Sequence, residues 1–109
     1  MQLTSFLQDK QLTIVLVGEI DHHGARMVMT QVADKIDQFL PALCILDFKS
    51  VTFMDSSGIA VVIHTYRRMA ELQGILRLKR VSAQPMKVLK AAGIDKIVSI
   101  EGREMAYES

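Results

Sequence analysis

The sequence has few of the features that mark secreted, membrane-spanning or nucleic-acid-binding proteins. A single cysteine, Cys44, excludes an internal disulfide. There is no tryptophan, and no hydrophobic run approaches the length needed to span a membrane. Thirteen basic and twelve acidic residues give a formal net charge of +1, which argues against broad electrostatic binding to nucleic acid or anionic lipid. No N-terminal segment resembles a signal peptide, so we expect a cytoplasmic protein without nucleic-acid or membrane partners.

The chain instead has the size and composition of one globular domain. It has 109 residues, half of them hydrophobic, and only two prolines. No linker rich in proline, glycine or serine divides it, and no repeat is visible. We therefore expect a single domain over residues 1–109 with one hydrophobic core.

Short apolar runs alternate with segments of helical periodicity, which predicts an α/β fold. Residues 3–7 and 12–17 predict an antiparallel hairpin with a turn at 8–11. Further strands are expected at 43–48, 75–80 and 97–100, and helices at 24–40, 57–73, in a short segment after Ser82, and at 101–107. The result is a mixed sheet of about five strands with about four helices.

The second helix carries apolar residues on more than one side, so its buried face has to be chosen from periodicity. We expect Gly74 to end this helix in the left-handed conformation. Val61 and Met69 lie off the stripe that we expect to be buried. That stripe consists of Ile59, Val62, Ile63, Tyr66 and Ala70.

The most informative segment is Asp55-Ser56-Ser57-Gly58, which follows a buried strand and opens the second helix. Serine and aspartate are common helix caps, so capping is the simplest interpretation. A hydroxyl at a helix N-terminus could also carry a phosphate, because unpaired N–H groups and the helix dipole favour negative charge there. The residues alone leave both interpretations open.

A second polar segment, Gly18-Glu19-Ile20-Asp21-His22-His23, precedes the first helix. The two adjacent histidines resemble metal ligands in composition only, because neighbouring side chains diverge and no second Cys or His pair has ligand spacing. The simpler interpretation is that Asp21 caps the first helix. A phosphate-binding glycine loop is also missing, so we expect no metal and no cofactor.

Catalysis by a serine nucleophile is a weaker hypothesis. Ser56 or Ser57 could supply the hydroxyl, but no Gly-x-Ser-x-Gly elbow is present. His64 lies one to two turns beyond Ser57 on the same predicted helix, a poor direction for activating it. We expect a protein that is not an enzyme, with a small hydrolase that uses Ser57 as the remaining alternative.

The segment Phe53-Met54-Asp55-Ser56-Ser57-Gly58 resembles the signature loop of STAS-domain proteins, and more narrowly that of bacterial anti-sigma factor antagonists. The segment from Gly18 to His23 matches the second signature of that family, and its paired histidines point to the sporulation branch. The resemblance covers nearly the whole chain. It implies that the helices pack mainly against one face of the sheet.

The resemblance also implies a function. In the family, a partner that is both anti-sigma factor and serine kinase binds the unphosphorylated antagonist and releases the sigma factor. Phosphorylation of the loop serine, here Ser57, ends the binding, and a serine phosphatase restores it. Partner contacts are then expected from Asp21, Met54, Asp55, Ser56, Gly58 and Val61. The alternative is a STAS subunit of a stressosome or of a lipid-transport complex.

Overall fold

The computed structural model describes residues 1–102 and contains five strands and three α-helices, with one short 3-10 helix. The strands are β1 (Gln2–Gln8), β2 (Gln11–Ile20), β3 (Leu43–Met54), β4 (Ile75–Val81) and β5 (Ser99–Gly102). The helices are α1 (His22–Phe39), α2 (Ser57–Glu71), α3 (Ala83–Ala91) and the 3-10 helix η1 (Ile94–Lys96). The predicted α/β fold with a mixed five-stranded sheet is confirmed.

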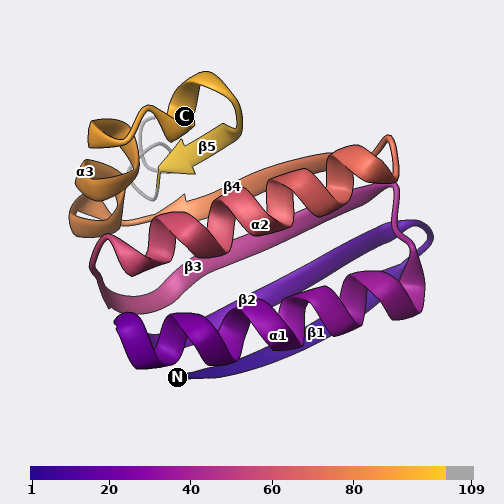
Figure 1. Cartoon of the computed structure of the whole chain (residues 1–109), viewed down its shortest axis with the longest axis horizontal. Helices are drawn as coiled ribbons and strands as arrows, with labels where there is room; N and C mark the ends of the chain where they lie inside the picture. The colour runs from indigo at the N-terminus through magenta and orange to yellow at the C-terminus, as the bar shows by residue number, and fades with distance from the viewer. Residues whose placement is uncertain (103–109) are drawn as a thin grey trace.

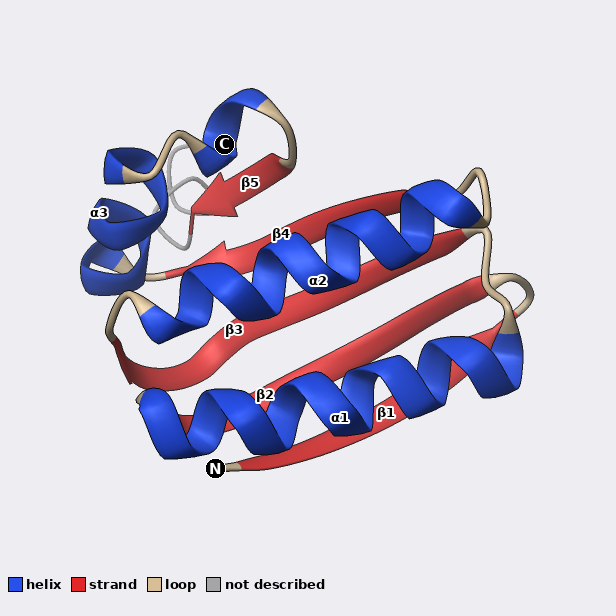
Figure 2. Ribbon diagram, in the orientation of Figure 1, coloured by secondary structure: helices blue, strands red, loops and turns tan. Residues whose placement is uncertain are grey.

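The strands follow one another across the sheet in the order β1-β2-β3-β4-β5. β1 and β2 form the predicted antiparallel hairpin, in which Gln8 pairs with Gln11 across the turn. The other three neighbouring pairs are parallel, and α1, α2 and α3 provide the crossovers between them. Figure 1 shows α1 and α2 side by side over one face of the sheet, as the family resemblance implies, and Figure 2 shows the two-layer arrangement.

The core lies between this sheet face and the two long helices. Alternate residues of the central strands point into it, so paired positions form continuous apolar rows across the sheet. Leu12, Cys44 and Leu76 form one row, and Ile14, Leu46 and Leu78 form the next. All six are at most 4% exposed. Burial raises the pKa of the Cys44 thiol to about 12, which fits the structural role expected for this cysteine.

The predicted buried stripe of α2 is correct only in part. Val62 is fully buried and Ile59, Ile63 and Tyr66 pack against the core, but the most deeply buried row lies to one side of the predicted one. Val61 and Met69, which we placed off the stripe, are fully buried, while Ala70 is exposed. The buried row also contains Thr65, whose hydroxyl donates to the Val61 carbonyl at 2.8 Å and so needs no other partner. All residues from Ile59 to Ile63 are apolar, so the sequence does not show which side of the helix is buried. The polar Thr65 in the buried row made the correct side look less apolar than it is.

Two predictions about segment ends also need correction. Gln73, not Gly74, adopts the left-handed conformation after α2, with φ 58°. Gly74 is required for a different reason, because a Cβ atom there would lie 2.9 Å from the Ala42 carbonyl oxygen. The helix expected at 101–107 is a strand at Glu101 and Gly102, and its remainder lies outside the described residues.

Candidate functional site

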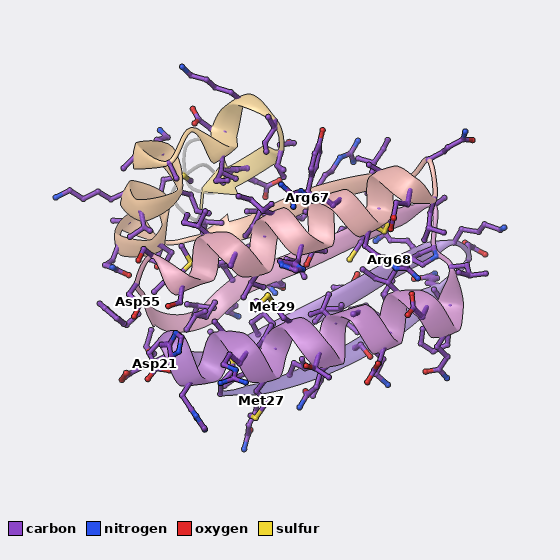
Figure 3. All side chains as sticks on the ribbon, viewed as in Figure 1. Asp21, Met27, Met29, Asp55, Arg67 and Arg68 are labelled. Atoms are coloured by element: carbon purple, nitrogen blue, oxygen red, sulfur yellow. The ribbon has the colours of Figure 1, made fainter. Side chains whose placement is uncertain are left out.

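The two polar segments singled out in the sequence meet at one end of the sheet. Ile20 and Met54 are register partners at the carboxyl ends of the parallel strands β2 and β3. The Asp55 backbone N–H donates to the Ile20 carbonyl at 3.2 Å. Asp21 and Asp55 directly follow these strands, and Figure 3 shows them at the same end of the molecule, where α1 and α2 begin. The structure therefore brings together both expected motifs.

The first motif forms the start of α1. Gly18 has a φ of 111° at an irregularity in the β2–β3 register, a conformation that glycine adopts most readily. Asp21 caps α1, because its Oδ1 accepts a hydrogen bond from the Gly24 N–H at 2.8 Å. His22 and His23 lie exposed in the first turn of the helix. The capping interpretation of this motif is confirmed.

The second motif forms the start of α2, and the Asp55 carboxylate caps this helix. Asp55 Oδ1 accepts a hydrogen bond from the Ser57 N–H at 2.8 Å, and the Asp55 carbonyl accepts one from the Gly58 N–H at 3.0 Å. Ser56 occupies the N-cap position, but its side chain makes no capping hydrogen bond. The negative charge of Asp55 thus lies at the positive end of α2.

The hydroxyls of Ser56 and Ser57 have no structural role in the part of the chain that the structure describes. Neither hydroxyl forms a hydrogen bond among residues 1–102. Ser56 is exposed, and Ser57 is half-buried as the first residue of α2. The Ser57 backbone is held by Asp55 while its hydroxyl remains unbonded. Attaching a group to this hydroxyl would therefore break no hydrogen bond of the Ser57 side chain.

Three of the residues expected to contact a partner are buried. Met54 and Val61 are fully buried, and Gly58 is buried above Met54. A Cβ atom at Gly58 would overlap the Met54 Cγ and Sδ atoms, so the glycine allows the helix start to lie directly on this methionine. The Met54 side chain thus packs against the start of α2, and Val61 belongs to the hydrophobic core. Asp21, Asp55 and Ser56 are the more accessible members of the predicted set, and the contact of all six residues with a partner stays a prediction.

A model of the STAS domain matches residues 7–105. The chain belongs to the STAS domain family. The anti-sigma F factor antagonist of Paenibacillus polymyxa is 31% identical over 94 residues, which cover 86% of this chain and 80% of that protein. The structure of the anti-sigma factor antagonist SpoIIAA in its unphosphorylated form has a TM-score of 0.79 at 25% identity, covering 98% of this chain and 94% of that one. The phosphorylated form of the Bacillus cell fate determinant SpoIIAA has a TM-score of 0.71 at 25% identity, with coverages of 98% and 97%.

The sequence did not reveal one residue that contacts the loop of this STAS domain. Gln84, in the first turn of α3, forms two hydrogen bonds with the Met54 backbone. The two residues are 30 positions apart, and Gln84 belongs to no motif. Its position near a helix start after a strand was the only available signal, and many surface glutamines have that position.

An apolar hollow adjoins the loop between α2 and α3. Its volume is about 510 Å³, and Lys87 provides the charged part of its lining. The remaining lining residues are Ser56, Ile59, Val88, Ala91 and Ala92. Because Ser56 belongs to both, the hollow and the STAS signature loop form one continuous surface.

The remaining chemistry of the site is limited. Residues 1–102 hold no group of three or more His, Cys, Asp or Glu side chains placed to bind a metal ion. Within the same range, no helix has both the length and the apolar character required to cross a membrane. The accessible groups of the site are a capped helix start, the hydroxyls of Ser56 and Ser57, two carboxylates and the imidazoles of His22 and His23.

Proposed function

We propose that this STAS domain is an anti-sigma factor antagonist controlled by phosphorylation of Ser57. The unphosphorylated form binds an anti-sigma factor that is also a serine kinase, and the sigma factor is released. A phosphate on Ser57 ends the binding, and a serine phosphatase restores it. The protein is then a phosphoacceptor rather than a catalyst, and the exchange of partners takes place in the cytoplasm.

The observation that carries this proposal is the state of the Ser57 side chain. Its backbone is held by Asp55, while its hydroxyl is unbonded at the first position of α2. Such a hydroxyl can be presented to a kinase without unfolding the helix. The names of the relatives support the proposal, since a similar protein from Paenibacillus polymyxa is called an anti-sigma F factor antagonist and a structure of similar fold is that of the anti-sigma factor antagonist SpoIIAA.

The surroundings of Ser57 offer a docking surface. Asp21 and Asp55, which Figure 3 shows at the same end of the molecule, offer polar groups for a partner, and so does the exposed Ser56 next to Asp55. The hollow beside Ser56 provides an apolar surface of the kind that the centre of a protein interface uses. The polar groups and the apolar hollow therefore both lie next to the proposed phosphoacceptor, Ser57.

A phosphate would change this surface electrostatically. It adds about 1.5 to 2 negative charges at neutral pH. Asp55 already places a carboxylate on the Ser57 N–H, so the new charge would lie close to an existing one. The helix N-terminus can tolerate the added charge in the free protein, but a desolvated interface cannot. The switch is thus a local change on a rigid scaffold.

Binding to an anti-sigma F factor with kinase activity, measured by calorimetry, tests this proposal. Ser57→Ala should bind like the wild type, since only a hydroxyl is lost. Ser57→Asp should bind at least about tenfold more weakly, equivalent to about 1.4 kcal/mol. Ser99→Asp adds the same charge at an exposed position of β5 and should bind normally. Equal binding by Ser57→Asp and Ser99→Asp, or no binding by Ser57→Ala, would contradict the proposal.

A further inference from the structure

The side-chain amide of Gln84 makes a two-point contact with the backbone of Met54, the second residue of the signature segment at 53–58. The Met54 N–H donates to Gln84 Oε1 at 2.9 Å, and Gln84 Nε2 donates to the Met54 carbonyl at 2.8 Å. Met54 is the last residue of β3, and Asp55 follows it directly. A side chain of α3 thus binds the chain one residue away from the cap of α2.

This contact replaces a missing strand. The β3–β4 pairing ends at Asp47 and Lys79, well before β3 itself ends. The Asp55 N–H is directed toward β2, where it reaches the Ile20 carbonyl, and neighbouring residues of a strand alternate their hydrogen-bonding direction. The backbone groups of Met54 therefore face the other side, where β4 no longer provides a partner. An amide side chain supplies the same donor and acceptor that a peptide group of a strand would supply.

We infer that Gln84 is a positioning residue, which fixes the signature loop to α3. Asp55 holds the Ser57 backbone from within the loop, and Gln84 holds the residue immediately before Asp55. Lys87 and Val88 of the same helix line the hollow beside Ser56. The two hydrogen bonds therefore keep a constant spacing between the hollow and the Ser57 hydroxyl. Without them, the end of β3 and the loop lose their connection to this side of the molecule.

The chemistry of the contact identifies the substitution that tests it. Only a group with one donor and one acceptor at this distance can form both bonds. An ionised glutamate at position 84 has two acceptors, so one oxygen would face the Met54 carbonyl and repel it. A protonated glutamate has an O–H donor and a carbonyl acceptor, and it can form both bonds again. The variant Gln84→Glu should therefore break the contact at neutral pH and restore it in acid.

Amide hydrogen exchange and backbone chemical shifts, measured by NMR on the full chain, test the inference without any partner. In Gln84→Glu at neutral pH, repulsion by the Met54 carbonyl should also displace the carboxylate from the Met54 N–H. We therefore expect the protection of the Met54 amide to fall about threefold to tenfold, the range for one lost hydrogen bond. In acid, its protection and shift should return toward those of the wild type at the same pH. Wild-type spectra recorded at each pH provide the reference. Gln84→Met, which has similar length and no amide, should lose protection at every pH.

The matched control is Gln31→Glu, which makes the same change at an exposed position of α1. It should leave the Met54 amide unchanged. Gln84 is itself exposed, so all of these variants should keep the native fold. Met54 protection in Gln84→Glu equal to that of the wild type at neutral pH, or no recovery in acid, would overturn the inference.

A second readout rests on the proposed function. With the kinase partner, Gln84→Glu should lower kcat/KM for phosphorylation by about tenfold, mainly through kcat, since the docking surface is kept but the hydroxyl is less well placed. Gln31→Glu should react normally. An unchanged kcat/KM in Gln84→Glu with a reacting wild type would overturn the role in positioning. A wild type that is never phosphorylated, with the Met54 exchange behaving as described, would instead count against the proposed function alone.

Discussion

The Asp55 carboxylate accepts a hydrogen bond from the Ser57 backbone N–H at 2.8 Å, so an acidic residue holds the proposed phosphoacceptor in place. The same contact caps α2 and leaves both neighbouring hydroxyls unbonded among residues 1–102. One side chain thus has a structural role and an electrostatic one. In the free protein it caps the helix start, and beside the proposed phosphate on Ser57 it would contribute repulsion.

The structural role of Asp55 can be measured by itself. Asp55→Ala removes the cap and should lower the free energy of unfolding by about 1 kcal/mol, within the range of about 0.5 to 2 kcal/mol for lost caps. Asp55→Asn keeps an acceptor oxygen and should lose much less. Urea denaturation of the three proteins provides the measurement, with Asp34→Ala on the exposed side of α1 as control. An equal decrease in the free energy of unfolding for Asp55→Ala and Asp34→Ala would show that the cap does not stabilise the protein.

Because Gly58 lies against Met54, we expect the substitution Gly58→Ala to destabilise the protein. Replacing a helical glycine by alanine normally stabilises a protein by about 1 kcal/mol. Here the new Cβ would overlap the buried Met54 side chain, so Gly58→Ala should destabilise the domain by about 1 to 3 kcal/mol.

A double-mutant cycle with Met54→Ala identifies the cause. Met54→Ala alone should cost about 2 to 5 kcal/mol, because it leaves a cavity under the loop. The cavity makes room for the extra methyl group of Gly58→Ala, so the double variant should lose at least about 0.5 kcal/mol less than the sum. Additive losses in chemical denaturation would mean that the two side chains do not compete for the same space.

Asp47 on β3 predicts how stability depends on pH. Burial acts to raise the pKa of its carboxyl, but hydrogen bonds from the Arg80 side chain and the Lys49 backbone N–H, together with the charges of both residues, hold the pKa below its ordinary value. The folded state therefore binds this proton less readily than the unfolded state does. The stabilisation is fully present above the unfolded pKa of about 3.9, and it is lost as the pH falls through the lower folded value.

Asp47→Asn keeps the size of the side chain and removes its charge. The free energy of unfolding of the wild type should exceed that of Asp47→Asn most above about pH 5, and the difference should shrink in acid. Urea denaturation over a pH series measures both proteins. A difference that stays constant down to the most acidic condition would show that the charge of Asp47 does not stabilise the fold.

We expect the Cys44 thiol to be unreactive in the native protein. Its pKa of about 12 and its complete burial mean that almost no thiolate is present or accessible at neutral pH. A thiol-specific disulfide reagent should modify the native protein only as fast as the protein unfolds, and should react completely in guanidinium chloride. Rapid reaction with the native protein would indicate that this part of the core opens far more often than its packing suggests.

The features that were predictable from the sequence are those in which local pattern and tertiary environment agree. The hairpin, the central strands and the cap by Asp21 all follow from short-range signals that the fold leaves unchanged. The buried face of α2 was predicted only in part, because Thr65 satisfies its hydroxyl within the helix and can therefore be buried. The contact of Gln84 with Met54 depends on how α3 returns to the sheet, and no local pattern carries that information.

Phosphopeptide mapping tests the central claim most directly. The wild type, Ser56→Ala and Ser57→Ala are each mixed with ATP and an anti-sigma F factor that has kinase activity, and the modified residue is identified by mass spectrometry. We predict one phosphate on Ser57 in the wild type and in Ser56→Ala, and none in Ser57→Ala. A phosphate on Ser56 that persists in Ser57→Ala, or no phosphate on any of the three proteins while the kinase modifies a control substrate, would contradict the account.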